Sequence, residues 1–156
     1  MAFHVEDDPD PLEVEFLETQ IRREASAAMG LGDEVELAIF VRDAGGVVAG
    51  ISGWTWGDCC ELQNLWVDPS LRDRGLGSRL LAAAEAEAAA RGCAQTVHFT
   101  YDFQAARLYE RAGYELMGRV EEFPSGADVL WYRKRLNPPA RRRPEVAEST
   151  TTSPAP

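Results

Sequence analysis

Residues 58–91 read DCCELQNLWV (58–67), DPSLRDRGLGS (68–78) and RLLAAAEAEAAAR (79–91). The first part has the apolar, branched and aromatic composition of a strand, and the third has the alanine-rich composition of a helix. The middle part is rich in Arg and Gly, which is typical of a loop. We therefore predict a strand, a loop and a long helix, with Gly75 and Gly77 where the helix begins.

This loop has the features of an anion-binding site. Gly75 and Gly77 leave backbone amides uncovered, and the first turn of a helix carries unpaired N–H groups and the positive end of the helix dipole. Arg72 and Arg74 add fixed positive charge, and a guanidinium group matches the geometry of a phosphate. A phosphate is therefore one expected ligand, and a tight strand–helix turn with exposed arginines is the alternative.

The whole-chain composition limits the classes of function. A chain of 156 residues has room for one domain with a core, and its 45% hydrophobic and 27% charged residues are typical of globular proteins. The net charge of −10 argues against nucleic acid as a partner. The sequence contains no run of 18 apolar residues, so we expect no membrane-spanning helix. Residues 1–8 lack a signal-peptide pattern, so we expect a cytoplasmic protein. The acidity either steers a cationic molecule inward or serves solubility alone.

The three cysteines do not indicate a metal site. Cys59, Cys60 and Cys93 lack the spacing of metal ligands, and three thiols cannot all pair. We expect buried thiols in a reducing compartment and no bound metal.

The rest of the chain predicts an alternation of strands and helices. Residues 2–7 predict a short opening strand, and a helix begins near Pro11, where proline is tolerated, and stops at Gly30. Three strands with short turns then form an antiparallel meander, and the strand–helix–strand unit predicts a parallel pair. The expected strands cover residues 35–41, 47–56, 59–67, 94–100, 114–117 and 128–136, and a short helix runs from an Asp102 cap to Ala112. We place one domain at residues 1–136 and a disordered tail at 137–156, which holds five of the nine prolines.

The loop resembles motif A of the GCN5-related N-acetyltransferases (GNAT), with the pattern (Gln/Arg)-x-x-Gly-x-(Gly/Ala). Arg72, Gly75 and Gly77 fill this pattern, and the preceding Leu65-x-Val67-x-Pro69 is similar to the end of the family's strand. The resemblance extends to about residue 136. It implies an α+β, three-layer fold with a mixed, mostly antiparallel sheet of about seven strands, a central parallel pair that opens into a V, and about four flanking helices.

The resemblance also implies acetyl-CoA as the cosubstrate and no metal. The cofactor would lie in the gap of the V, and its pantetheine arm would pair with the strand backbone at Leu65, Trp66 and Val67. Its pyrophosphate would bind the loop and the first helical turn. These residues are Arg72, Asp73, Arg74, Gly75, Leu76, Gly77, Ser78 and Arg79.

A second landmark is ARLYERAGY at residues 106–114, which resembles the family's Ala-x-x-(Leu/Phe)-Tyr segment. The resemblance implies that Tyr109 donates a proton to the departing CoA thiolate, as a phenol is able to do at neutral pH. A core tyrosine is the alternative. Many relatives carry Asn where this chain has Phe103, and the Phe-Gln-Ala segment is similar to a subgroup of the family. Gln104 is therefore a candidate for the missing cofactor contact.

A base must deprotonate the amine before it attacks a thioester. Glu61 is the candidate because it lies eleven residues before Arg72, the offset of the general-base Glu in histone-type members. Burial would raise the pKa of such a carboxyl group. The alternative is an exposed Glu or one that orients the acceptor, and His98 is a weaker rival. Three tryptophans could line an acceptor slot or belong to the core: Trp54, Trp56 and Trp66.

The resemblance therefore predicts an acetyl-CoA-dependent N-acetyltransferase that transfers the acetyl group directly to a primary amine. The seven acidic residues within positions 6–18 favour a small cationic acceptor. Two alternatives stay open: a protein Nε- or Nα-acetyltransferase, and an acyl-CoA-binding sensor without turnover. Many relatives are dimers, so a homodimer is an expectation that the sequence leaves open.

Overall fold

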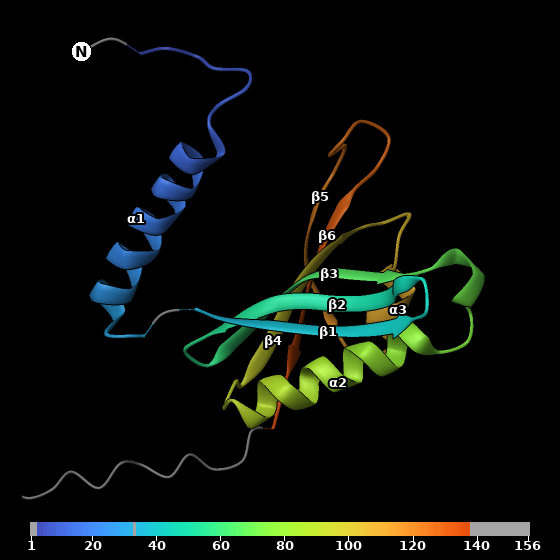
Figure 1. Cartoon of the computed structure of the whole chain (residues 1–156). Coiled ribbons are helices and arrows are strands. Elements are labelled where there is room, and N and C mark those ends of the chain that lie inside the picture. Colours follow the sequence, from blue (N-terminus) through green and yellow to red (C-terminus); the bar gives the residue numbers. More distant parts are fainter. Residues whose placement is uncertain (1–2, 33, 138–156) are drawn as a thin grey trace, which may run out of the picture.

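The computed structural model describes residues 3–32 and 34–137 (Figure 1). Within these residues the chain forms three α-helices, one 3-10 turn and one six-stranded sheet. Most of the predicted tail lies outside the described residues. The elements are α1 (Pro11–Met29), β1 (Val35–Asp43), β2 (Gly46–Trp56), β3 (Cys59–Val67), η1 (Pro69–Leu71), α2 (Leu76–Ala90), β4 (Gln95–Tyr101), α3 (Ala106–Arg111), β5 (Glu115–Val120) and β6 (Val129–Arg135).

The sheet has the strand order β1-β2-β3-β4-β6-β5. Strands β3 and β4 pair in parallel, and the other four pairs are antiparallel. The parallel pair follows from the chain path, because α2 carries the chain from the end of β3 back to the start of β4. The predicted mixed sheet with one parallel pair is confirmed.

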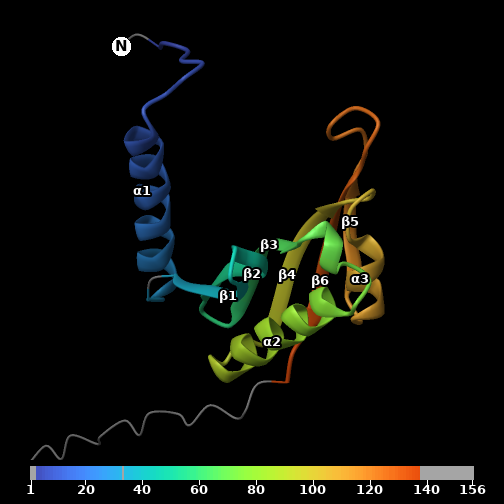
Figure 2. The same cartoon turned by 45° about the vertical axis from the view of Figure 1, so that its right-hand side comes forward.

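One face of the sheet, which we call the covered face, packs against α2 and α3 (Figure 2). Leu80, Leu81, Ala84 and Ala88 form the buried side of α2. The small alanines let the helix approach the strands closely, and leucines fill the space between them. The buried strand residues beneath them are Leu37, Ala49, Ile51, Cys60, Leu62 and Tyr132.

The opposite face carries exposed aromatic side chains and packs against no described helix. We call it the open face and define it by Phe40, Trp54, Trp66, Phe99 and Trp131. Strand register places Phe40 opposite Gly50 and Gly50 opposite Trp66. Phe99 lies opposite Trp131, with 5.1 Å between ring centroids. A solvent-facing sheet surface is usually polar, so this aromatic surface is unusual.

Helix α1 forms as the sequence predicts. The Asp10 carboxylate accepts a hydrogen bond from Leu12 N at 2.9 Å, Pro11 opens the first turn, and Gly30 ends the helix in the left-handed region at φ 64°. However, no residue of α1 is buried. The helix stands away from the sheet in both views (Figures 1 and 2).

Three predictions were wrong in detail. Residues 3–7 form no strand, because α1 carries them beyond the far end of the molecule, where no sheet edge is available (Figure 1). The described residues therefore form six strands and three α-helices rather than about seven and about four. The short helix begins at Ala106 rather than after an Asp102 cap, because Asp102 N donates to Asp128 O at 2.9 Å and residues 102–105 form turns.

Candidate functional site

The first turn of α2 presents backbone N–H groups with no side-chain cap. Gly75 occupies the N-cap position in the left-handed region at φ 74°, where only glycine is free of strain. Its carbonyl accepts from Arg79 N at 3.1 Å, which starts the helical hydrogen bonds. Among the residues that the structure describes, no side chain caps the preceding amides. They lie at the positive end of a 15-residue helix, so an anion would be stabilised there.

The arginines of the loop have different surroundings. Arg72 Nε donates to the Val67 carbonyl at 3.0 Å, which ties the loop to the end of β3. Arg74 and Arg79 are exposed. Neither forms an ion pair or a side-chain hydrogen bond within residues 3–32 and 34–137, so both charges are available to an anionic ligand.

Strands β3 and β4 separate beside this loop. Their pairing runs only from Cys59 opposite Gln95 to Leu62 opposite His98. Beyond that point β3 stays paired with β2, and β4 stays paired with β6. The two strands therefore open into the V that the family resemblance implies, and we call this region the splay.

A bulge at Gly53 accompanies the separation. The β2–β3 register shifts between Ser52 and Gly53, directly beside the last β3–β4 pair. A Cβ atom at Gly53 would overlap the Glu61 carbonyl, so only glycine fits there. Gly53 was not among the predicted functional residues, although glycine inside a strand is a recognised signal for a bulge or a close backbone approach.

Three elements meet at Gly77. A Cβ atom at this position would lie 3.7 Å from Leu108 Cδ2 and 3.9 Å from Val67 Cγ2. The start of α2, the end of β3 and helix α3 therefore converge, which brings both sequence landmarks to one side of the splay.

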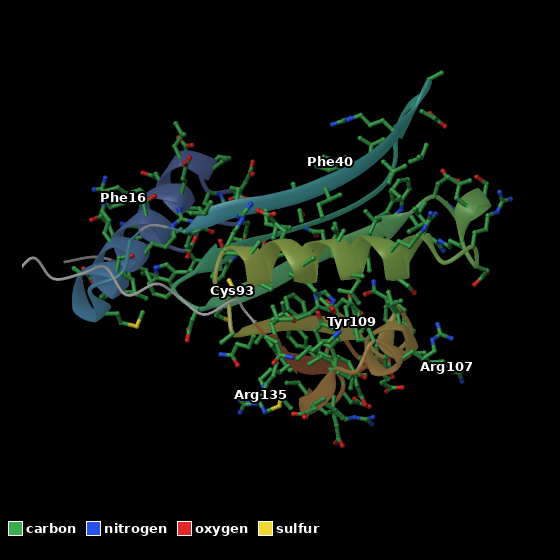
Figure 3. The ribbon with its side chains drawn as sticks, turned by 90° about the horizontal axis from the view of Figure 1, so that it is seen from below. Phe16, Phe40, Cys93, Arg107, Tyr109 and Arg135 are labelled. Carbon is green, nitrogen blue, oxygen red and sulfur yellow. The ribbon has the colours of Figure 1, made fainter. Side chains whose placement is uncertain are left out.

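Tyr109 lies in the aromatic cluster of the covered face (Figure 3). Its ring stacks on His98 with 4.3 Å between centroids and meets Tyr114 edge-on at 5.4 Å. Burial raises the pKa of the Tyr109 phenol, so it stays protonated at neutral pH. Within the described part of the chain its hydroxyl has no hydrogen-bond partner. The phenol is therefore a proton donor whose hydrogen is not taken by any acceptor among the described residues.

His98 connects Tyr109 to the splay. Its Nδ1 lies 2.6 Å from the Leu62 carbonyl, and because a carbonyl only accepts, Nδ1 carries the hydrogen. Burial lowers the pKa of His98, which favours the neutral ring. The hydrogen bond falls on the last β3–β4 pair, and the ring packs against Tyr109. His98 thus links the Tyr109 ring to the point where the β3–β4 pairing ends. No sequence pattern indicated these two contacts.

Glu61 lies on the open face, on the opposite side of the sheet from Tyr109. Register places it between Trp54 and Val97, and the residue is partly exposed rather than buried. The two candidate catalytic groups therefore do not share a face. The β3–β4 pairing ends one residue after Glu61, at Leu62 opposite His98, so Glu61 lies beside the start of the splay.

The remaining candidates, Gln104 and the three tryptophans, differ in their contacts. Gln104 is exposed, and its Oε1 accepts from Thr100 Oγ1 at 3.2 Å at the end of β4. Trp56 Nε1 donates to Gly32 O at 2.8 Å and so anchors the segment after α1. Trp54 is half-buried and Trp66 is exposed, both on the open face.

The described residues contain no group of three His, Cys, Asp or Glu side chains arranged for a metal ion. Burial raises the pKa of Cys59 to about 11 and that of Cys60 to about 12, so neither thiol is an effective nucleophile at neutral pH. None of the described helices is long and apolar enough to cross a membrane.

A hollow of about 600 Å³ lies between β1 and the later turns of α2, lined by Leu37, Ala83 and Arg91 among others, away from the loop.

The model of the Acetyltransferase (GNAT) family matches residues 2–114. Blasticidin-S acetyltransferase of Streptomyces morookaense is 39% identical over 104 residues, which cover 66% of this chain and 69% of that protein. The crystal structure of an acetyltransferase-family protein from Agrobacterium tumefaciens is 31% identical, with a TM-score of 0.81 over 87% of this chain and 100% of that chain. An aminoglycoside 6′-N-acetyltransferase complexed with coenzyme A has the same fold, at 19% identity and a TM-score of 0.60 over 90% of this chain and 100% of that chain.

Proposed function

Because this chain belongs to the GNAT family and is an N-acetyltransferase, we propose that it transfers an acetyl group from acetyl-CoA directly to the primary amine of a small cationic molecule. The observation that carries the proposal is the splay between β3 and β4. The uncapped start of α2 and Tyr109 lie on its covered side, and Glu61 lies on its open side.

The residues at the splay fit acetyl-CoA as a substrate. The uncapped amides of α2 suit a pyrophosphate, as do the guanidinium groups of Arg74 and Arg79, which form no ion pair within the described part of the chain. The stretch of β3 after Leu62 has no β4 partner. Its backbone groups are therefore able to pair with the amide groups of a pantetheine arm. The remaining cofactor contacts that we propose are Leu65, Trp66, Val67, Asp73 and Gln104.

The proposed chemistry uses one group on each face. A neutral amine attacks the thioester carbonyl, a C–N bond forms, and the C–S bond breaks. Tyr109 donates its proton to the leaving thiolate, and its hydroxyl is not engaged by any described residue. Glu61, on the open face, accepts the proton that the amine loses, directly or through water.

The charge distribution supports a cationic acceptor. The chain carries a net charge of −10, and seven acidic residues lie within positions 6–18. Register also places Glu36, Trp54 and Glu61 in one row across the open face. Such a surface raises the local concentration of a cation. The name of the Streptomyces relative, a blasticidin-S acetyltransferase, supports a small-molecule acceptor.

Thiol release from acetyl-CoA tests this proposal on a panel of polyamines, aminoglycosides, blasticidin S and lysine-containing peptides. We expect turnover that depends on a small polycationic amine, with acetylated product detected by mass spectrometry. Turnover with peptides alone would contradict the proposal and indicate a protein acetyltransferase instead. Tight acetyl-CoA binding without acceptor-dependent turnover would contradict the proposal and indicate an acyl-CoA-binding sensor.

A further inference from the structure

Tyr109 depends on neighbouring rings for its orientation. It lies on α3, which has six residues and no side-chain hydrogen bond at its N-cap within the described part of the chain, and so short a helix is marginal without packing. The Tyr109 hydroxyl forms no hydrogen bond with another described residue. Three rings surround the Tyr109 ring instead, at centroid distances of 4.3, 5.4 and 6.0 Å: His98, Tyr114 and Tyr132. Packing therefore sets the position of the phenol.

Among the described residues, His98 is the one of these three rings that is also hydrogen-bonded to β3. The residue is 5% exposed, and its Nδ1 donates to the Leu62 carbonyl at 2.6 Å. Leu62 and His98 form the last β3–β4 pair, where the splay begins. The hydroxyls of the two tyrosines bond to residues of β4 and α3 instead. His98 therefore links Tyr109 to the strand along which the proposed cofactor lies.

We propose that His98 is a positioning residue for acetyl transfer: the Leu62 carbonyl holds the imidazole, and the imidazole holds the Tyr109 phenol beside the splay. The inference rests on the proposed role of Tyr109 as the leaving-group acid. A proton donor must lie within hydrogen-bonding reach of the group that it protonates, and a displacement of about 1 Å costs on the order of 100-fold in rate. His98 therefore acts on kcat, whereas the proposed anchors of acetyl-CoA are the amides of α2.

The alternative is a histidine that serves only the stability of the core. Both roles predict that a substitution of His98 lowers Tm. They differ in kcat, because only a positioning residue acts on the rate, and in whether the loss of rate passes through the Tyr109 hydroxyl. The experiments below measure these two differences.

Nitrogen-15 NMR of the imidazole tests the hydrogen bond to β3. The chain has two histidines, so the variant His4→Gln leaves His98 as the single imidazole. Burial lowers the pKa of His98, and we expect a neutral ring at pH 7 with its hydrogen on Nδ1. A ring with its hydrogen on Nε2 would overturn the proposal, because Nδ1 would then have no hydrogen to donate to Leu62.

Two substitutions of His98 each remove one contact. His98→Phe keeps a ring for the Tyr109 stack and loses the donor to Leu62, whereas His98→Asn keeps an N–H group near the position of Nδ1 and loses the ring. For each variant we expect kcat to fall about tenfold, with the Kd for acetyl-CoA within about twofold of the parent. The rate is thiol release from acetyl-CoA with the panel amine of highest turnover. A parental kcat in either variant would overturn the proposal, because the lost contact would not be needed.

Tyr114→Phe is the matched control for stability. It removes a buried hydrogen bond from the same ring cluster, the 2.9 Å bond to Thr96 on β4. We expect its Tm to fall and its kcat to stay parental, with Tm measured by circular dichroism and every rate measured well below the lowest Tm. A loss of kcat equal to that of the His98 variants would show that the rate follows core stability, and would overturn the proposal.

The double variant His98→Phe, Tyr109→Phe separates this inference from the proposed function. If His98 acts through the Tyr109 hydroxyl, the double variant should have the kcat of Tyr109→Phe within about twofold. Losses that multiply would overturn the positioning role and leave Tyr109 as the acid. A parental kcat in Tyr109→Phe alone would reject the proposed acid and this inference with it.

Discussion

The two faces of the sheet differ in how completely the chain covers them. On the covered face, α2 and α3 bury leucines, alanines and the Tyr109–His98 stack, and packing fixes each side chain. On the open face, Trp54 and Glu61 lie side by side in register and stay partly exposed. Under the proposed function this difference would be a division of roles, with the cofactor and the leaving-group acid on the covered face and the amine on the open face.

The largest effect is expected at the start of α2. Gly77→Trp should weaken acetyl-CoA binding on the order of 100-fold or more, because a large side chain would occupy the approach to the uncapped amides. Gly77→Ala is the control, since its Cβ would lie in ordinary contact at 3.7 Å from Leu108. Calorimetry with acetyl-CoA measures both. Normal affinity in the Trp variant would remove this loop from the cofactor site.

Tyr109→Phe removes one hydroxyl from the covered face and keeps the ring stacked on His98. We expect kcat to fall about 10²-fold or more, the usual scale for a lost proton donor, with acetyl-CoA affinity unchanged. Tyr114→Phe is the control, because its hydroxyl bonds Thr96 inside the core at 2.9 Å and should affect stability rather than kcat. An unchanged kcat in Tyr109→Phe would exclude this residue from the mechanism.

Glu61→Gln tests the open face. We expect kcat/KM for the amine to fall about tenfold or more at neutral pH and its pH profile to lose the contribution of one base. Glu36→Gln is the matched control for the pH profile, because it removes a carboxylate from the same row of the open face: it should raise the KM for a cationic amine but keep the parental pH profile. Equal pH profiles for Glu61→Gln and the parent would show that another group or a water path serves as the base.

The smallest effect is expected at His98, in the dependence of stability on pH. Burial lowers the pKa of His98 below its ordinary 6.5, so the unfolded chain binds more protons than the folded chain as pH falls below about 6.5. The stability that the neutral ring contributes is present above that pH and is lost as pH falls through the folded pKa. The loss in Tm between pH 7 and pH 5 should therefore be smaller in His98→Asn than in the parent. An identical loss would exclude His98 as a contributor.

Local sequence signals predicted the elements well. Strand β3 has its predicted bounds, and α1 begins at Pro11 and ends before Gly30, because proline and glycine mark those positions directly. The parallel pair followed from the strand–helix–strand order. The prediction of a strand at residues 2–7 was wrong because a strand requires an adjacent sheet edge, and composition alone does not reveal whether one is there.

The candidate site was predictable in its residues but not in its arrangement. Arg72, Gly75 and Gly77 were identified by their pattern, and their roles with a bound cofactor stay predictions. That Tyr109 and Glu61 lie on opposite faces depends on strand register. The Leu62 contact of His98 also needed coordinates, because these residues lie 36 positions apart. That the described residues bury no side chain of α1 is likewise a tertiary property, which helical periodicity does not predict.

The most direct test of this account is a crystal structure of the protein with bound coenzyme A. We expect the pyrophosphate at the amides of Leu76, Gly77 and Ser78, and the thiol in the splay within about 3.5 Å of the Tyr109 hydroxyl. Coenzyme A bound elsewhere, for example in the hollow between β1 and α2, or a thiol on the far side of the sheet from Tyr109, would contradict it.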